Sequence, residues 1–341
     1  MRPVRWRRRL VSGLALAMLT LVAGATPAAA DAAGPTDYRT EITSVEPPTE
    51  GVELRMIGGD SFLELVNVGG FEILVVGYQG EPYLRFEPDG RVLQNERSPS
   101  RYLNDDRFGD STIPPEADAD APPDWVEVSS DGSYAWHDHR THWMNPARPP
   151  GASPGDQILE AAVPLQVDDT IVTVTVQSFW LPAPSPVPAV VAAALGAAAA
   201  AAVAVAAVRR ADRWWWSAGL AAVAAVAAAG LGLVAYRSVP SETEPSLALW
   251  LLPAIAVLSA AAAALVRRRS AVLADGLLLL TALELVVWAW NRRDAVSAAI
   301  IPTDAPYALD RATISFAAAV GVVVAAGRVA ALLRPTATPT A

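Results

Sequence analysis

The sequence LPAPSPVPAVVAAALGAAAAAAVAVAAVRR, residues 181–210, decides how this chain is organised. Four prolines precede an uninterrupted run of twenty apolar residues, 189–208, which two arginines close. A helix of that length spans roughly 30 Å, the thickness of the hydrocarbon layer of a bilayer. The stretch therefore predicts a proline-rich hinge over 181–188 that leads into a membrane-spanning helix.

Four further apolar segments follow the first one. Together the five predict an α-helical transmembrane domain over residues 189–333, with a cytoplasmic tail at 334–341. Small residues recur at a spacing of four in the last segment, at Ala317, Gly321 and Ala325, and small faces let helices approach closely. We therefore expect a compact bundle whose first partner is the lipid bilayer. The five predicted spans are 189–208, 214–236, 247–266, 271–290 and 313–333.

Residues 1–30 have the pattern of a secretory signal peptide, with five arginines before the apolar run Leu10–Ala25 and small residues at 28–30 for cleavage. An uncleaved signal anchor, which would add a sixth spanning helix, is the alternative. Both interpretations place residues 31–188 outside the cytoplasm. The loop arginines agree, because seven lie on the opposite side of the predicted bundle and four on the same side, and positive charge favours the cytoplasm. We expect a multi-pass cell-membrane protein whose C-terminus is cytoplasmic.

Residues 31–180 predict an extracytoplasmic β-domain. Short β-branched and aromatic runs alternate with Gly, Asn and Asp turns, and residues 171–176 (IVTVTV) alternate strictly, as is typical of a sheet with one buried face. The predicted fold class is therefore α+β in two domains, an antiparallel, immunoglobulin-like β-sandwich followed by the helical bundle. The expected strands are 38–45, 52–57, 61–66, 71–78, 82–86, 91–94, 125–128, 134–139, 158–166 and 170–180.

Composition and charge exclude several functions. The chain has no cysteine, so a disulfide, a thiolate metal site and a cysteine nucleophile are all excluded. Residues 31–184 carry 27 acidic residues and 9 arginines, a net charge of 9 − 27 = −18, which argues against nucleic acid because phosphates need a basic surface. The acidic, proline-containing segment 98–124 is expected to be a long solvated loop, and its spacing matches no EF-hand calcium loop.

The three histidines of the chain lie within six residues, in the string WHDHRTHWM at 136–144. On an extended strand His137 and His139 share one face, roughly 6.6 Å apart, and a turn after Arg140 would let His142 join them. Neutral imidazoles suit zinc and copper, and the thioether of Met144 favours copper(I). The string therefore predicts a metal site with these four side chains as ligands. The alternative is that the histidines satisfy buried polar groups at the edge of a sandwich.

Within the same string, Asp138 is expected to orient an imidazole by bonding its second nitrogen. An ion pair between Asp138 and Arg140 is the other role open to this carboxylate. The two roles make different demands on the local structure, since the first needs the carboxylate beside a histidine ring and the second needs it beside a guanidinium.

Three ionisable residues fall inside the predicted spans. Asp275 and Arg328 lie four and five residues from the same end of antiparallel helices, so they should sit at similar depth, roughly 6–8 Å in, and form an ion pair. Glu284 lies nine residues from Asp275, on the opposite side of that helix, and has no evident partner. Intramembrane charges are candidates for function, and a purely structural pair is the alternative.

The order of signal peptide, histidine-bearing β-domain and helical bundle resembles the CopC–CopD type of copper-handling fusion. That resemblance implies a cupredoxin-like sandwich that binds copper. The chain departs from the type because Asp31, and not a histidine, would begin the mature domain, and its spans carry no histidine. The string at 136–144 also resembles multi-pass envelope proteins of high-GC Gram-positive bacteria.

Three functions are consistent with these features. The first is a membrane-anchored binding module, not an enzyme, whose exported domain binds copper or zinc. The second is a structural or sensory envelope protein that engages a protein partner. The third is a small transporter that uses the intramembrane carboxylates, although no inverted repeat is evident among the spans. The absence of a serine elbow motif and of cysteine disfavours a hydrolase.

Overall fold

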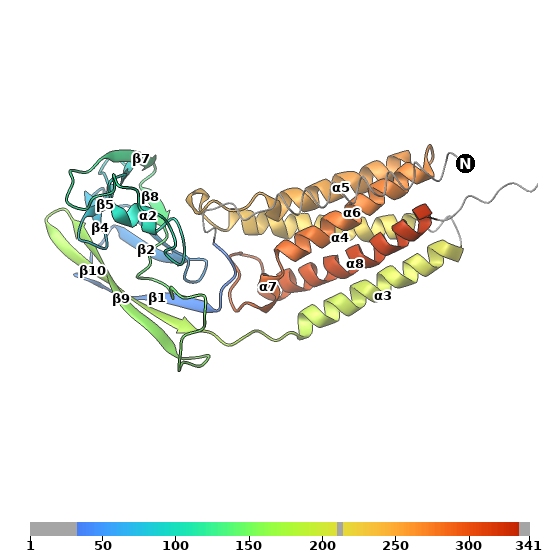
Figure 1. Ribbon diagram of the computed structural model, residues 1–341, viewed down its shortest axis with the longest axis horizontal. Coiled ribbons are helices and arrows are strands. Elements are labelled where there is room, and N and C mark those ends of the chain that lie inside the picture. The colour runs from blue at the N-terminus through green and yellow to red at the C-terminus, as the bar shows by residue number, and fades with distance from the viewer. Residues whose placement is uncertain (1–32, 210–213, 334–341) are drawn as a thin grey trace, which may run out of the picture.

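The computed structural model describes residues 33–209 and 214–333, and it has two parts (Figure 1). Ten antiparallel strands form a head, at the left of Figure 1, and five helices long and apolar enough to cross a membrane form a bundle at its right. The predicted β-sandwich followed by a helical bundle is thereby confirmed. The expected signal peptide at 1–30 and cytoplasmic tail at 334–341 lie outside the described residues.

The strands of the head form two antiparallel sheets of unequal size. The larger sheet has the order β1-β10-β9-β4-β5-β6-β7, and the smaller one has the order β2-β3-β8. The strands are β1 (Tyr38–Glu46), β2 (Val52–Ile57), β3 (Phe62–Asn67), β4 (Ile73–Val76), β5 (Pro82–Phe86), β6 (Val92–Asn95), β7 (Trp125–Ser129), β8 (Ser133–Trp136), β9 (Gln157–Val167) and β10 (Thr170–Trp180).

One hydrophobic core joins the two sheets. Val172, Val174 and Val176 of β10 are fully buried, as the alternation of 171–176 predicts, and they pack in the same cluster as Leu65 and Trp136 of the smaller sheet. Side chains on one face of each strand therefore fill the space between the sheets, which is the packing that a sandwich requires. The core holds the ends of β3 and β8 in place, and the candidate site is built at those ends.

The long segment after β6 is not loop throughout. It begins with a five-residue helix, α2 (Pro99–Leu103), with a proline in its first turn. The buried carboxylate of Glu81 accepts hydrogen bonds from the hydroxyls of Ser98 and Ser100, at 2.8 and 2.7 Å, and fixes the start of this helix. A helix of little more than one turn has no apolar period to reveal it, so the sequence did not predict it.

Successive long helices of the bundle run in opposite directions (Figure 1). Its long helices are α3 (Val187–Arg209), α4 (Trp214–Arg237), α5 (Ala248–Val266), α6 (Ala271–Asn291) and α8 (Tyr307–Leu333). Helix α8 is central, since it contacts α3, α4 and α6, while α5 packs between α4 and α6. The short helices η2 (Ser241–Thr243) and α7 (Asp294–Ser297) lie in the connections at the end that faces the head.

Small residues set the distance between these helices, as their spacing predicts. A Cβ atom added at Gly321 of α8 would lie 2.8 Å from the carbonyl oxygen of Ala282 in α6. A Cβ added at Gly232 of α4 would lie 1.9 Å from the carbonyl oxygen of Leu249 in α5. Both distances are far below van der Waals contact, so the backbones approach as closely as they do only because these positions lack a side chain.

The head is joined to the bundle by more than the hinge. Thr36 and Ile300 form an antiparallel bridge with two backbone hydrogen bonds, of 3.1 and 2.9 Å. The backbone N–H of Ala299 donates to the carboxylate of Asp37 at 3.0 Å. Gly59, at a φ of +85°, packs against this bridge, where a Cβ would lie 3.0 Å from a methyl of Ile300. The loop before α8 is therefore hydrogen-bonded to the backbone at the base of the head.

Candidate metal centre

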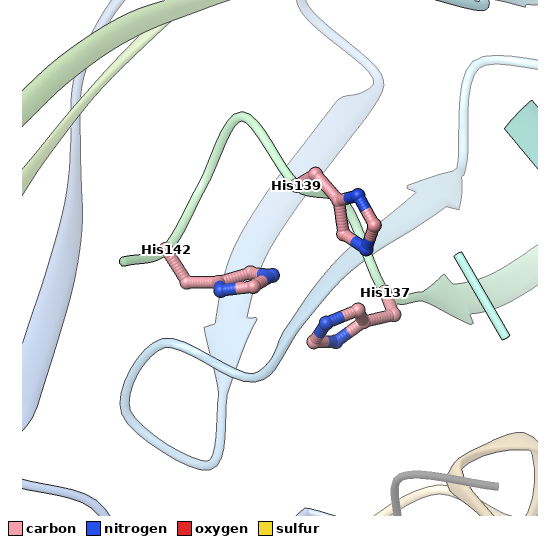
Figure 2. A group of neighbouring side chains, drawn as sticks. All are labelled: His137, His139 and His142. Carbon is pink, nitrogen blue, oxygen red and sulfur yellow. The ribbon is translucent and has the colours of Figure 1, made fainter. Parts of the chain in front are cut away.

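The three histidines lie together in the loop that follows β8. One ring nitrogen of each lies within 4.8 Å of those of the other two. The ring centroids of His137 and His142 are 4.3 Å apart, and that of His139 is 5.6 Å from the first and 5.5 Å from the second. The rings point toward a common space (Figure 2). In the part of the chain that the structure describes, no other group of three or more ligand-type side chains converges in this way.

The histidines converge for a different reason from the one expected. The strand predicted over 134–139 ends at Trp136, so the first two histidines do not share a strand face. The chain turns at Asp138, whose carbonyl oxygen accepts hydrogen bonds from the backbone N–H and the hydroxyl of Thr141, at 2.9 and 2.7 Å. This turn brings His142 back to the other two histidines, as a turn in this part of the string was expected to do.

The fully buried carboxylate of Asp138 holds the turn in place. It accepts a hydrogen bond from the indole of Trp136 at 3.0 Å and two from the guanidinium of Arg140 at 2.8 and 2.7 Å. Burial by itself would raise the pKa of Asp138, but the hydrogen bonds and charge of Arg140 hold that pKa below its ordinary value. Asp138 is therefore an ionised structural anchor, the second of the two roles considered for it.

Arg140 ties the same turn to the rest of the head. Its guanidinium donates to the carbonyl oxygen of Val76 at 3.0 Å and lies over the ring of Tyr78 at 4.9 Å. The Tyr78 hydroxyl accepts the backbone N–H of His139 at 2.8 Å, and the two rings stack with centroids 5.8 Å apart. The backbone of the histidine loop is thus fixed from the end of β4 as well as from β8.

Backbone carbonyls, and not Asp138, hold the imidazole rings. The Nδ1–H of His137 donates to the carbonyl oxygen of Ser61 at 2.5 Å, and the Nδ1–H of His142 donates to that of Trp143 at 3.2 Å. His139 is held through its Nε2, which is 2.7 Å from the carbonyl oxygen of Asp106. Such contacts fix the tautomer and orientation of a ring, as they do around metal-bound histidines in general.

Two of the ring nitrogens are buried without a hydrogen-bond partner in residues 33–209 and 214–333. These are the Nε2 atoms of His137 and His142, whose residues are 4% and 1% exposed. With Nδ1–H used as a donor, each Nε2 carries its lone pair into the space between the rings. A buried polar atom with no partner costs about 1–3 kcal/mol of folding free energy. A group that accepts the two lone pairs, such as a metal ion, would remove this cost.

The environment keeps these imidazoles neutral. Burial lowers the pKa of His137 to about 4 and that of His142 to about 2, and the guanidinium of Arg107 together with the neighbouring imidazoles acts in the same direction. Both rings are therefore uncharged at neutral pH. The uncharged ring is the form that can ligate a metal.

Met144, the fourth expected ligand, is half-buried and lies beside Gly109. Gly109 fills the position beside it, since a Cβ built there would lie 3.3 Å from the methyl of Met144 and 3.4 Å from Cε1 of His139. Met144 is therefore a neighbour of His139 across Gly109. Its role as a fourth ligand stays a prediction.

Sequence reasoning missed the groups that hold the site from other parts of the chain. Ser61 comes from the start of β3, and Asp106 and Arg107 come from the acidic segment. The Arg107 guanidinium is paired with the fully buried carboxylate of Asp60 at 2.5 Å. The one available signal was the length of segment 98–124, because long loops in compact domains often carry function.

The intramembrane charges form a different kind of site. Arg328 donates to a carboxylate oxygen of Asp275 at 3.0 Å, which is the pairing that their depths predict. The same oxygen accepts the indole N–H of Trp214 at 2.8 Å. Glu284 is 3% exposed, and its Oε2 has no hydrogen-bond partner. The structure therefore joins two of the three predicted residues and leaves the third apart from them.

A second buried ion pair, which the sequence did not indicate, lies at the end of the bundle that faces the head. Arg292 donates to Asp310 at 2.7 Å, and Arg311 donates to the carbonyl oxygen of Ala298 at 2.6 Å. Helix α8 begins at Tyr307, six residues before the expected span, and this extra length buries Asp310. Arg292 and Asp310 both lie outside the predicted spans 271–290 and 313–333.

No protein-family model matches the chain, and no curated protein or solved structure matches it either. The resemblance to the CopC–CopD type stays a prediction based on architecture. The site must therefore be interpreted from its own geometry.

Proposed function

We propose that this protein is a membrane-anchored metal-binding module, and that His137, His139 and His142 bind one transition-metal ion, zinc or copper, outside the cytoplasm. The observation that carries the proposal is the pair of buried, unpartnered Nε2 atoms in a group of three convergent imidazoles. A metal ion would accept both lone pairs and remove the cost of leaving them unpaired. The carbonyl oxygens that hold each ring supply the outer contacts that such a site needs.

The choice between zinc and copper depends on the fourth ligand. Three neutral imidazoles suit zinc and both oxidation states of copper. The thioether of Met144 lies next to His139 and would favour copper(I) if it moved onto the metal. Binding, and not catalysis, is the role that we assign, because the string supplies ligands and no nucleophile.

Metal titration of the full chain in lipid nanodiscs tests the proposal. We expect saturable, one-to-one binding of zinc by calorimetry, and loss of that binding when all three histidines are replaced by alanine. Because the head is acidic, Asp118→Asn combined with Asp120→Asn in the exposed part of the acidic segment is the matched control, and it should bind zinc as the parent does. Binding that survives the triple replacement, or no saturable binding at all, would remove the metal site.

The orientation in the membrane has its own test, which uses the absence of cysteine from the chain. Ser130→Cys places a single thiol on an exposed turn of the head, and Ala271→Cys places one at the far end of the bundle. In intact cells a membrane-impermeant maleimide should label the first and spare the second. Labelling of the second alone would reverse the proposed orientation.

Glu284 supports a second candidate, a small transporter that moves protons or cations through the bundle. Its carboxyl is buried among the helices and Oε2 has no partner, unlike the carboxylate of Asp275. Glu284→Gln keeps the shape of the side chain and removes its charge. Proton-coupled uptake into proteoliposomes should stop in this variant, and uptake that continues unchanged would exclude the role.

A further inference from the structure

A cavity opens beside the histidine cluster on the side that faces the base of the head. Its volume is about 360 Å³, and its lining includes His137, Ser61, Trp143 and two arginines, Arg107 and Arg148. Small-molecule sites typically have volumes of about 300–1,000 Å³, so the cavity has room for a compact ligand of a few heavy atoms. His137 connects it to the proposed metal site, since that residue belongs to both.

The histidine cluster brings no negative charge to a metal. Its imidazoles are neutral donors, so a divalent ion would enter a buried site with both of its charges uncompensated. Two fully buried carboxylates of the head are already engaged, Asp60 by Arg107 and Asp138 by Arg140. Among the described residues, no carboxylate joins the convergent group as a fourth ligand. The missing charge must come from outside the protein.

The cavity is suited to supply an anion. Arg148 is exposed and has no carboxylate partner in the described part of the chain; its guanidinium lies over the ring of Trp180 at 5.4 Å. Among the described residues, Asp37 is the one acidic residue in the lining, and one of its carboxylate oxygens accepts the backbone N–H of Ala299. The guanidinium fork of arginine matches the geometry of carboxylate and phosphate groups.

From these observations we infer that the metal at His137, His139 and His142 keeps its fourth position open to this cavity, where a small oxyanion, a carboxylate or a phosphate, binds the metal and the guanidiniums of Arg107 and Arg148 together. This inference rests on the proposed metal site. The inference adds a class of ligand to the proposed metal site. The protein would bind a metal and an anion as a pair, and each would increase the affinity of the site for the other.

Cobalt(II) is the probe for the test, because its visible spectrum changes when a ligand in its coordination shell is exchanged. The full chain in nanodiscs is loaded with cobalt(II) and titrated separately with acetate and with inorganic phosphate. We expect a saturable spectral change with at least one of them, and the two titrations identify which oxyanion the site prefers. Arg148→Gln should lower the affinity for that anion roughly tenfold, because the variant loses one charge-assisted hydrogen bond.

Arg91→Gln is the matched control, since Arg91 is an exposed arginine that pairs with Asp89 away from the cavity. It should bind the anion as the parent does. A cobalt spectrum that neither anion changes would overturn the inference while leaving the metal site intact, and so would equal effects of the two arginine replacements. Failure of cobalt(II) itself to bind would overturn both the inference and the proposed function, and the absence of a cobalt spectrum identifies that outcome.

Discussion

The histidine cluster of the head and the ion pair of the bundle are both buried polar groups, but they satisfy their polar atoms in opposite ways. In the bundle, Asp275 meets a charge of opposite sign, Arg328, and an indole donor. In the head, the Nε2 atoms of His137 and His142 meet no hydrogen-bond partner among the residues that the structure describes. The Asp275 carboxylate is therefore paired without a ligand, whereas the two imidazole nitrogens are not.

The difference follows from the cost of burial. An ionised group inside the bilayer must be paired within the protein, because neither lipid nor water can compensate it there. A neutral imidazole can be buried at a much lower cost, so its lone pair can remain available for a ligand. The Asp275–Arg328 pair therefore indicates a structural role, and the buried neutral nitrogens of the histidine cluster indicate binding.

The largest expected effect breaks the ion pair. Arg328→Gln leaves the Asp275 carboxylate without its counter-charge, and loss of one partner of a buried pair costs about 4 kcal/mol. Amide hydrogen exchange along α6 and α8 should accelerate accordingly. Asp275→Asn combined with Arg328→Gln should recover part of the loss, and zinc binding by the head should not change. Additive losses in the double variant would show that the two residues do not stabilise each other.

Acid should lower the folding stability of the metal-free head and leave the Asp275–Arg328 ion pair of the bundle unaffected. The pKa values of His137 and His142 in the folded state, about 4 and about 2, lie below the ordinary value. Below pH 6.5 the unfolded chain therefore takes up protons that the folded head excludes, so stability is lost as the pH falls from 6.5 toward the folded-state values. Between pH 7 and pH 5 each histidine contributes about 2 kcal/mol to this loss.

The measurement is amide exchange in β8, β9 and β10 of the metal-free protein at a series of pH values. Replacement of His142 by Gln should remove about half of the pH dependence, because it removes one of the two titrating groups. A head whose stability is constant from pH 7 to pH 5 would mean that these rings are not buried in the neutral form.

Zinc should stabilise the head alone. At a free concentration one hundred times its dissociation constant, a ligand that binds only the folded state adds about 2.7 kcal/mol. Protection of the amides around β3 and β8 should rise by that amount, and a chelator should reverse it. Amides in the middle of α6 should serve as the internal control, and equal stabilisation there would indicate that zinc acts somewhere other than the histidine cluster.

The smallest effect concerns Met144. If its thioether completes a copper(I) site, Met144→Leu should lower the affinity for copper(I) about tenfold, or about 1.4 kcal/mol. The affinity for zinc should not change. Competition with a copper(I)-specific chelator measures the first value, and calorimetry measures the second. An equal loss for both metals would point to a change in the packing around Gly109 and not to a metal–sulfur bond.

Most of the architecture was accessible from local patterns. The alternation in residues 171–176 predicts the buried valines of β10, and the apolar runs predict the five long helices. Even the Asp275–Arg328 pair followed from position alone, because a helix advances by a constant rise and two antiparallel helices share one depth scale. Regular elements repeat a fixed geometry, and a fixed geometry can be counted along the sequence.

The site itself was accessible only in part. The sequence indicated which residues converge, since all three histidines fall in one short string, but it placed the first two on a strand that ends before them. The partners that orient the rings, Ser61 and Asp106, come from the residue before β3 and from the acidic segment. The arginines of the cavity come from two different loops.

By itself, then, the sequence determined the elements, their order and the residue types available for chemistry, because each of these depends on neighbours along the chain. The tertiary structure alone decided which nitrogens are left without partners, which carboxylates are already paired and where the cavity opens. Those properties depend on contacts between residues far apart in the chain, such as His137 with Ser61 and Arg107 with Asp60. No local period encodes them, because they arise only when the two sheets close around one core.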